Sequence, residues 1–226
     1  MSQSTTLTTE TTSSGPSERA TTRLLLAGGT VAGPLFIVAS LVQAFTRPGF
    51  DIRRMAISML TLGDLGWIQR TNFVVSGLLV LACAVGLRRA LRAGRGPTWG
   101  PVLLAGYGVG LVTAGVFTPD PALGFPAGAP TGNPTSYSGH AMLHTVAFFV
   151  AFISLIAACL VLARRFAGAG RRGWAVYCVA SALLPVPLIA LSMALGGSGV
   201  PLIVMGAITS AWVAVLPANL MREQRH

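Results

Sequence analysis

Residues 140–163 read HAMLHTVAFFVAFISLIAACLVLA, and this stretch decides the fold class of the chain. It holds no Asp, Glu, Lys or Arg, and it exceeds the roughly 20 apolar residues with which an α-helix crosses the hydrocarbon core of a bilayer. Two arginines, Arg164 and Arg165, follow directly. The stretch therefore predicts a membrane-spanning helix with a basic boundary.

Similar apolar runs recur along the chain and predict six spans, at about 24–45, 68–88, 99–118, 140–163, 173–195 and 200–220. Of the 226 residues, 53% are hydrophobic and 10% are charged, whereas soluble domains carry about 25% charged residues. Because backbone groups in lipid need internal hydrogen-bond partners, such runs form helices rather than open strands. The predicted fold is all-α, a six-helix transmembrane bundle over residues 23–221.

The basic residues are all arginines, and most lie in short clusters beside the apolar runs. Clusters at 88–95 and 164–172 share a side with both termini if the spans alternate, and the positive-inside bias makes that side cytoplasmic. The Ser/Thr-rich segment 1–22 is predicted as a disordered cytoplasmic tail, and 222–226 as a second tail. The net charge of +10 thus indicates orientation in the cell membrane and not nucleic-acid binding.

Spacing of three and four residues collects polar side chains on one stripe of several spans. Near the outer ends these stripes carry Gln43, Asn72, His140 and His144. Polar side chains at membrane depth usually face inward and partner one another. We therefore expect an outward-opening polar pocket, covered by loops that hold Asp64 and Asp120. We expect Phe148, Phe149 and Phe152, on the other side of the fourth span, to face lipid.

The loop at 46–67 combines apolar residues at helical spacing with arginines. Asp51 can cap the start of a short interfacial helix that includes Met55 and Met59 on its apolar side. Three arginines depart from the inside bias: Arg47, Arg53 and Arg54. They suit either ordinary contact with lipid phosphates and nearby acids, or a rim that binds the headgroup of a specific anionic lipid.

The fourth span begins with two histidines one helical turn apart. His140 and His144, with Asp120, supply three ligands for a zinc ion and leave room for a water that could attack an ester or amide. The alternative is structural, with both imidazoles hydrogen-bonded to loop carbonyls or to Asp120. The glutamate of an HExxH motif is absent beside the pair, so we expect no bound cofactor and keep zinc as the alternative.

Transport is a third class of function. The inner halves of the spans lack ionisable residues, which argues against an ion-coupled carrier. Passive transport or lipid movement stays open, and Pro185-Val186-Pro187 predicts a break in the fifth span.

Four segments together resemble a bacterial family of six-helix membrane proteins, domain-of-unknown-function family 998. They are GPLFIVASLVQAFTRPGFD (33–51), LTLGDLGWIQRTNFVVSGLLVLACAVGLRR (60–89), GVFTPDPALGFP (115–126) and GHAMLH (139–144). The third segment places Pro119 between Thr118 and Asp120, where the family pattern has Thr-Asp directly. The resemblance implies a six-span integral membrane protein and brings no activity, substrate or cofactor.

These patterns favour a non-catalytic module that binds or senses a small or lipid-like ligand in an outward-facing pocket. The ligand-binding candidates are Gln43, Arg47, Arg53, Arg54, Asp64, Asn72, His140 and His144. A metal-dependent membrane hydrolase that uses Asp120, His140 and His144 is the alternative. The expected partners are membrane lipids, and the sequence does not indicate an oligomeric state.

Overall fold

A computed structural model describes residues 15–91 and 96–223. Within these ranges the chain forms helices α1 (Pro16–Thr46), η1 (Ile57–Thr61, a 3-10 helix), α2 (Gly66–Ala90), α3 (Trp99–Val116), α4 (Gly139–Gly168), α5 (Arg172–Leu183), α6 (Pro185–Ala194) and α7 (Gly199–Glu223). The described residues form no β-strand beyond one isolated bridge between Ala122 and Phe125. Six described segments, with α5 and α6 taken together, are long and apolar enough to cross a membrane. The all-α six-span prediction is confirmed.

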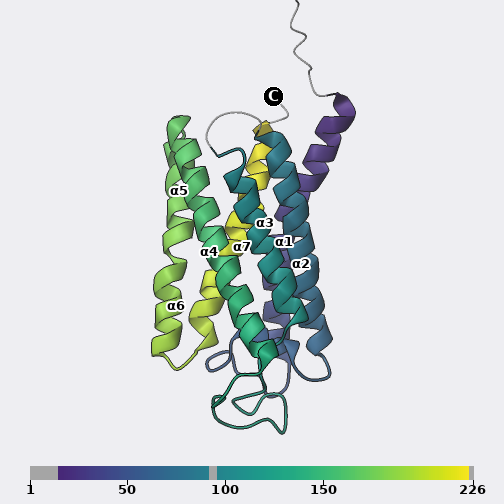
Figure 1. Cartoon of the computed structure of the whole chain (residues 1–226), viewed down its shortest axis with the longest axis vertical. Coiled ribbons are helices and arrows are strands. Elements are labelled where there is room, and N and C mark those ends of the chain that lie inside the picture. The colour runs from purple at the N-terminus through teal and green to yellow at the C-terminus, as the bar shows by residue number, and fades with distance from the viewer. Residues whose placement is uncertain (1–14, 92–95, 224–226) are drawn as a thin grey trace, which may run out of the picture.

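The long helices lie side by side in one bundle (Figure 1). Each helix packs against its neighbours in sequence, and α7 returns to pack against α1, which closes a ring. We call the end with the connections 47–65, 117–138 and 195–198 the loop end. We call the opposite end, where α1 begins and α7 finishes, the arginine end. The loop end is at the bottom of Figure 1.

Helix α1 begins at Pro16, eight residues before the predicted start of the first span. Proline suits the first turn because an N–H at that position would have no partner within the helix. The carboxylate of Glu18, also in the first turn, interacts favourably with the positive end of the helix dipole. The predicted disordered tail is therefore helical from residue 16 onward, while its residues 1–14 lie outside the described residues. Likewise α7 continues to Glu223, and residues 224–226 lie outside them.

The fifth span is divided at Leu184 into α5 and α6, as the two prolines predict. Pro185 has no N–H to donate to the preceding turn, whereas Leu184 still donates to the carbonyl of Ala180 at 3.0 Å. The two segments therefore remain nearly continuous and together span the height of the bundle.

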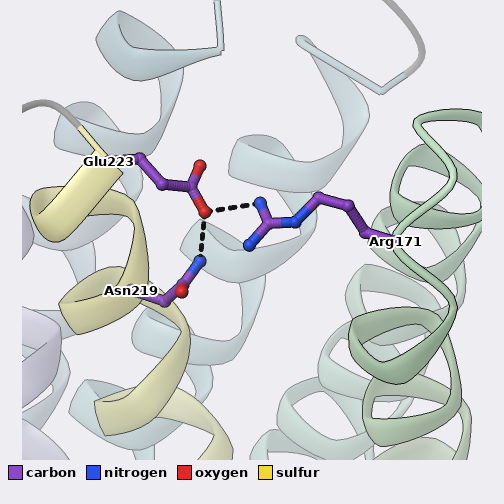
Figure 2. A network of polar contacts seen from close by, with 3 residues as sticks. All are labelled: Arg171, Asn219 and Glu223. Atoms are coloured by element: carbon purple, nitrogen blue, oxygen red, sulfur yellow. Dashed lines mark hydrogen bonds and ion pairs between the residues drawn. The ribbon is translucent and has the colours of Figure 1, made fainter. Parts of the chain in front are cut away.

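A polar network joins the two sides of the ring at the arginine end (Figure 2). Glu223 on α7 accepts hydrogen bonds from Arg171, before α5, and from Asn219. The Arg171 guanidinium also lies over the rings of Phe166 and Trp174, 5.0 and 5.7 Å from their centres. This network ties the α4–α5 turn to the last turn of α7.

The predicted interfacial helix is present in a shorter and tighter form. Asp51 Oδ1 accepts the backbone N–H of Arg53 at 3.0 Å and begins a single turn. Ala56 is extended, so helical hydrogen bonding restarts only at Ile57 as the 3-10 helix η1. Met59 is buried, and η1 packs against α1, α2 and α7. The apolar side of this segment therefore covers the bundle.

Candidate functional site

A cavity of about 80 Å³ lies inside the ring near the loop end. One water molecule needs about 10–15 Å³ of such space, so the cavity holds several atoms. Five long helices and η1 contribute to its wall, and η1 closes it toward the loop end. The main lining residues are Phe36, Phe73, Tyr107, Leu111, His144, Phe148, Phe152, Met205, Gly206 and Thr209. The wall is predominantly apolar.

Two aromatic residues of α4 that we expected to face lipid also contribute to this wall. Phe148 and Phe152 line the cavity, and the ring of Phe152 is 6.4 Å from that of Tyr107. Phe149 is 50% exposed, as predicted for a lipid-facing side chain. Phe148 and Phe152 are half-buried and contribute to the cavity wall as well, because a helix in a ring packs against two neighbours and also faces the central space, which covers a wider arc than one stripe.

His144 is buried and fixes the end of α3. Its Nδ1 lies 2.8 Å from the carbonyl oxygen of Phe117 and 3.2 Å from that of Ala114. Because carbonyl oxygens only accept hydrogen bonds, Nδ1 carries the proton, and in the neutral ring Nε2 is an acceptor. The structural alternative for this histidine, hydrogen bonding to loop carbonyls, is therefore the one that the geometry supports.

The other two proposed zinc ligands, His140 and Asp120, interact electrostatically. His140 is exposed, with its ring 5.3 Å from that of Phe117. Asp120 accepts the backbone N–H of Ser138 at 2.8 Å, and hydrogen bonds from the Ser138 hydroxyl and N–H lower the pKa of Asp120, as the charge of His140 also does. Ser138 in turn caps α4. Residues 15–91 and 96–223 contain no cluster of three His, Cys, Asp or Glu arranged to hold a metal, so the zinc hypothesis stays a prediction without geometric support.

Gln43 and Asn72 belong to a buried hydrogen-bond network between α1 and α2. Gln43 Nε2 donates to Gln69 Oε1 at 2.7 Å, and Gln69 Nε2 donates to Ser40 Oγ at 2.9 Å. Asn72 Nδ2 donates to the Phe36 carbonyl at 3.1 Å. These amides partner one another across the helix interface, and neither Gln43 nor Asn72 lines the cavity beside His144. The four residues that were predicted to form one pocket therefore lie apart: Gln43 and Asn72 in this network, His144 in the cavity wall and His140 on the surface.

A second hollow, of about 200 Å³, adjoins the cavity at the loop end. It is more polar, and both charged residues in its lining, Arg54 and Asp120, were predicted candidates. Ala56 and Ser58 line both spaces, so the two spaces lie side by side, and the hollow has the larger share of polar groups in its wall. Arg53 and Asp64 are exposed and lie outside both linings.

Arg47 has a structural position. Its Nη1 donates to the carbonyl of Leu60 and its Nη2 to that of Leu62 at 2.7 Å. Its guanidinium carbon is 5.1 Å from the centre of the Phe125 ring. Burial lowers the pKa of Arg47, and the carboxylate of Asp64 opposes that shift. Arg47 therefore joins the end of α1, η1 and the long 117–138 connection.

Sequence reasoning missed most of the cavity wall, in particular Tyr107, Met205, Gly206 and Thr209. Nothing in their local sequence distinguishes them from ordinary packing residues. Their place follows from which helices become neighbours.

The fold and its apolar helices define a multi-pass helical membrane protein. The chain belongs to the family described as "Protein of unknown function (DUF998)", whose model matches residues 30–219. The resemblance drawn from the sequence motifs is thereby confirmed. No curated protein and no solved structure matches the chain.

Proposed function

We propose that this protein binds one amphiphilic phospholipid at its loop end, without catalysis. The part of the hydrocarbon chain nearest the head occupies the apolar cavity, and the head occupies the hollow. The observation that carries this proposal is that an almost wholly apolar cavity adjoins, through Ala56 and Ser58, a more polar hollow that holds Arg54 and Asp120. An amphiphile has the same division of character along its length.

The two spaces contribute differently to binding. A hydrocarbon chain in a bilayer is already in an apolar medium, so moving it into the cavity gains mainly close packing. Selectivity must therefore come from the head. Arg54 suits an anionic group, because a guanidinium binds the oxygens of phosphate with paired hydrogen bonds.

The proposed orientation places the loop end on the outer face of the cell membrane. Most described arginines lie at the arginine end, which the positive-inside bias assigns to the cytoplasm. A membrane-impermeant thiol reagent added to intact cells tests this directly, because all three native cysteines are buried. Ser136→Cys is expected to react and Ala169→Cys to remain protected, whereas the opposite pattern would reverse the orientation.

Gly206 offers a way to block the cavity without disturbing the bundle. It lines the cavity, and a Cβ atom there would have one heavy atom within 4 Å, Ile37 Cδ1 at 3.8 Å. Gly206→Phe therefore places a ring in the cavity. Val204→Phe is the matched control, because Val204 is on the same helix and is 46% exposed.

The experiment uses the protein in nanodiscs with a single-chain phosphatidylglycerol that carries a diazirine on its chain. Cross-links are expected at Phe148, Phe152 and Met205, with a yield at least tenfold lower in Gly206→Phe and unchanged in Val204→Phe. Arg54→Gln should weaken binding about fivefold, which is about 1 kcal/mol, while Arg53→Gln should not. Equal cross-linking of the cavity in the wild type and Gly206→Phe would disprove the proposal.

A further inference from the structure

His144 lies at the level where the two spaces meet. Ala141, one turn of α4 nearer the loop end, lines the hollow. Thr145, the residue after His144, lines it as well. On the other side, Ala147 and Phe148 line the cavity. A ligand that occupies both spaces therefore passes His144 at the junction between its head and its chain.

One ring nitrogen of His144 remains available for a ligand. Nδ1 is turned to the carbonyl oxygens of Ala114 and Phe117. Nε2 lies on the opposite side of the imidazole, so its lone pair points away from those carbonyls. The His144 ring lines the cavity and meets the Phe73 ring edge to face, with centres 6.4 Å apart.

Three other polar side chains line the cavity, and two of them, Tyr107 and Thr209, are already engaged by the protein. Thr209 Oγ1 donates to the carbonyls of Met205 and Gly206, both at 3.1 Å. The Tyr107 hydroxyl is paired with Thr209. The hydroxyl oxygens of Ser58, Tyr107 and Thr209 can also accept, but an imidazole nitrogen is the stronger hydrogen-bond acceptor, so a donor on the ligand is best accepted by His144 Nε2.

We infer that the ligand carries a free hydroxyl group between its hydrocarbon chain and its head, and that this hydroxyl donates a hydrogen bond to Nε2 of His144. This inference rests on the proposed function and narrows its ligand class. The chemistry fits a single-chain glycerophospholipid, whose middle glycerol carbon keeps its hydroxyl. A two-chain lipid carries an ester at that carbon and has no hydrogen to donate.

The test compares two lipids that differ by one hydrogen-bond donor. The first is a single-chain phosphatidylglycerol with a free 2-hydroxyl, and the second is its 2-O-methyl ether. Each competes with the diazirine probe for the protein in nanodiscs. Because a buried acceptor left without its donor is costly, the wild type is expected to bind the hydroxyl lipid about tenfold more tightly.

His144→Asn is the decisive variant, because the asparagine amide can still donate toward the α3 carbonyls but has nothing in the place of Nε2. The tenfold preference should disappear in this variant and persist in His140→Asn, whose histidine is exposed. The preference is a ratio within one variant, so a general loss of affinity cancels. A preference that survives His144→Asn, or equal binding of both lipids by the wild type, overturns the inference and leaves the proposed function intact. Failure of both lipids to compete overturns both.

A measurement on the wild type covers the case in which His144→Asn does not fold. With ¹⁵N-labelled histidine, the Nε2 resonance of His144 should move to lower frequency with the hydroxyl lipid and stay in place with the ether. An unchanged resonance with both lipids overturns the inference.

Discussion

Replacing Gly33 by alanine tests how closely α1 and α7 approach where they close the ring. A Cβ atom at Gly33 would lie 2.1 Å from the carbonyl oxygen of Ser210 and 2.9 Å from its carbonyl carbon. Since carbon and oxygen atoms in close contact lie about 3.3 Å apart, the two helices must separate by roughly 1 Å. Both groups that clash belong to helical segments, so a side-chain rotation cannot relieve the contact.

Gly206→Ala is the matched control for this substitution. Both alanines gain about 1 kcal/mol of helix propensity over glycine, and this gain cancels when the two variants are compared. At Gly206 the nearest heavy atom to the new Cβ is 3.8 Å away, so nothing opposes the gain. Overpacking costs about 1–3 kcal/mol, and we expect Gly33→Ala to be less stable than Gly206→Ala by that amount.

The assay is equilibrium unfolding by SDS titration in mixed micelles, followed by tryptophan fluorescence. Trp212 on α7 is fully buried and should report the separation of this helix. The expected order of midpoints is Gly206→Ala at or above the wild type, and Gly33→Ala below it. Indistinguishable midpoints for the two variants would refute the close crossing of α1 and α7.

Three further substitutions test the ends of the bundle. Arg47→Gln should cost about 1–3 kcal/mol of unfolding free energy by leaving two carbonyls without donors, and a wild-type midpoint would remove its structural role. Asp120 has a lowered pKa through Ser138, so its contribution is full above about pH 4 and is lost as the pH falls through the folded pKa. Protection of the amides at 119–138, measured against the intrinsic exchange rate at each pH, should therefore fall below about pH 4 in the wild type and be low at pH 7 in Asp120→Asn, whereas equal protection in both proteins at pH 7 would contradict this. Glu223→Gln should cost at most about 1 kcal/mol, because the Arg171 and Glu223 side chains are 32% and 43% exposed, and a cost that persists in 1 M salt would contradict an ion pair.

The number and placement of the helices could be predicted from the sequence because bilayer thickness fixes the length of an apolar run. The break before Pro185 could be predicted because proline removes a helical donor. The expectation that Gln43 and Asn72 find polar partners rests on the same physics, and each does so inside the α1–α2 interface.

The cavity could not be predicted, because it depends on contacts between helices that are distant in sequence. Phe148 is an apolar residue that suits a position facing lipid as well as one facing the central cavity, so its identity does not predict which position it takes. The position of His144 could be predicted, but the choice between ligand and structural partner depends on where α3 ends, at the carbonyls of Ala114 and Phe117. The extended conformation of Ala56, which ends the first turn of the 46–67 loop, has no signal in its neighbours.

The pairing of α1 with α7 also determines when, during synthesis, the ring of helices can close. During synthesis α1 is made first, and the surface around Gly33 has no permanent neighbour until α7 is complete. The intermediate helices can pair with their predecessors as they are inserted, but the ring closes only after α7 has been made. Until α7 is inserted, the surface of α1 around Gly33 is therefore left without the helix that covers it.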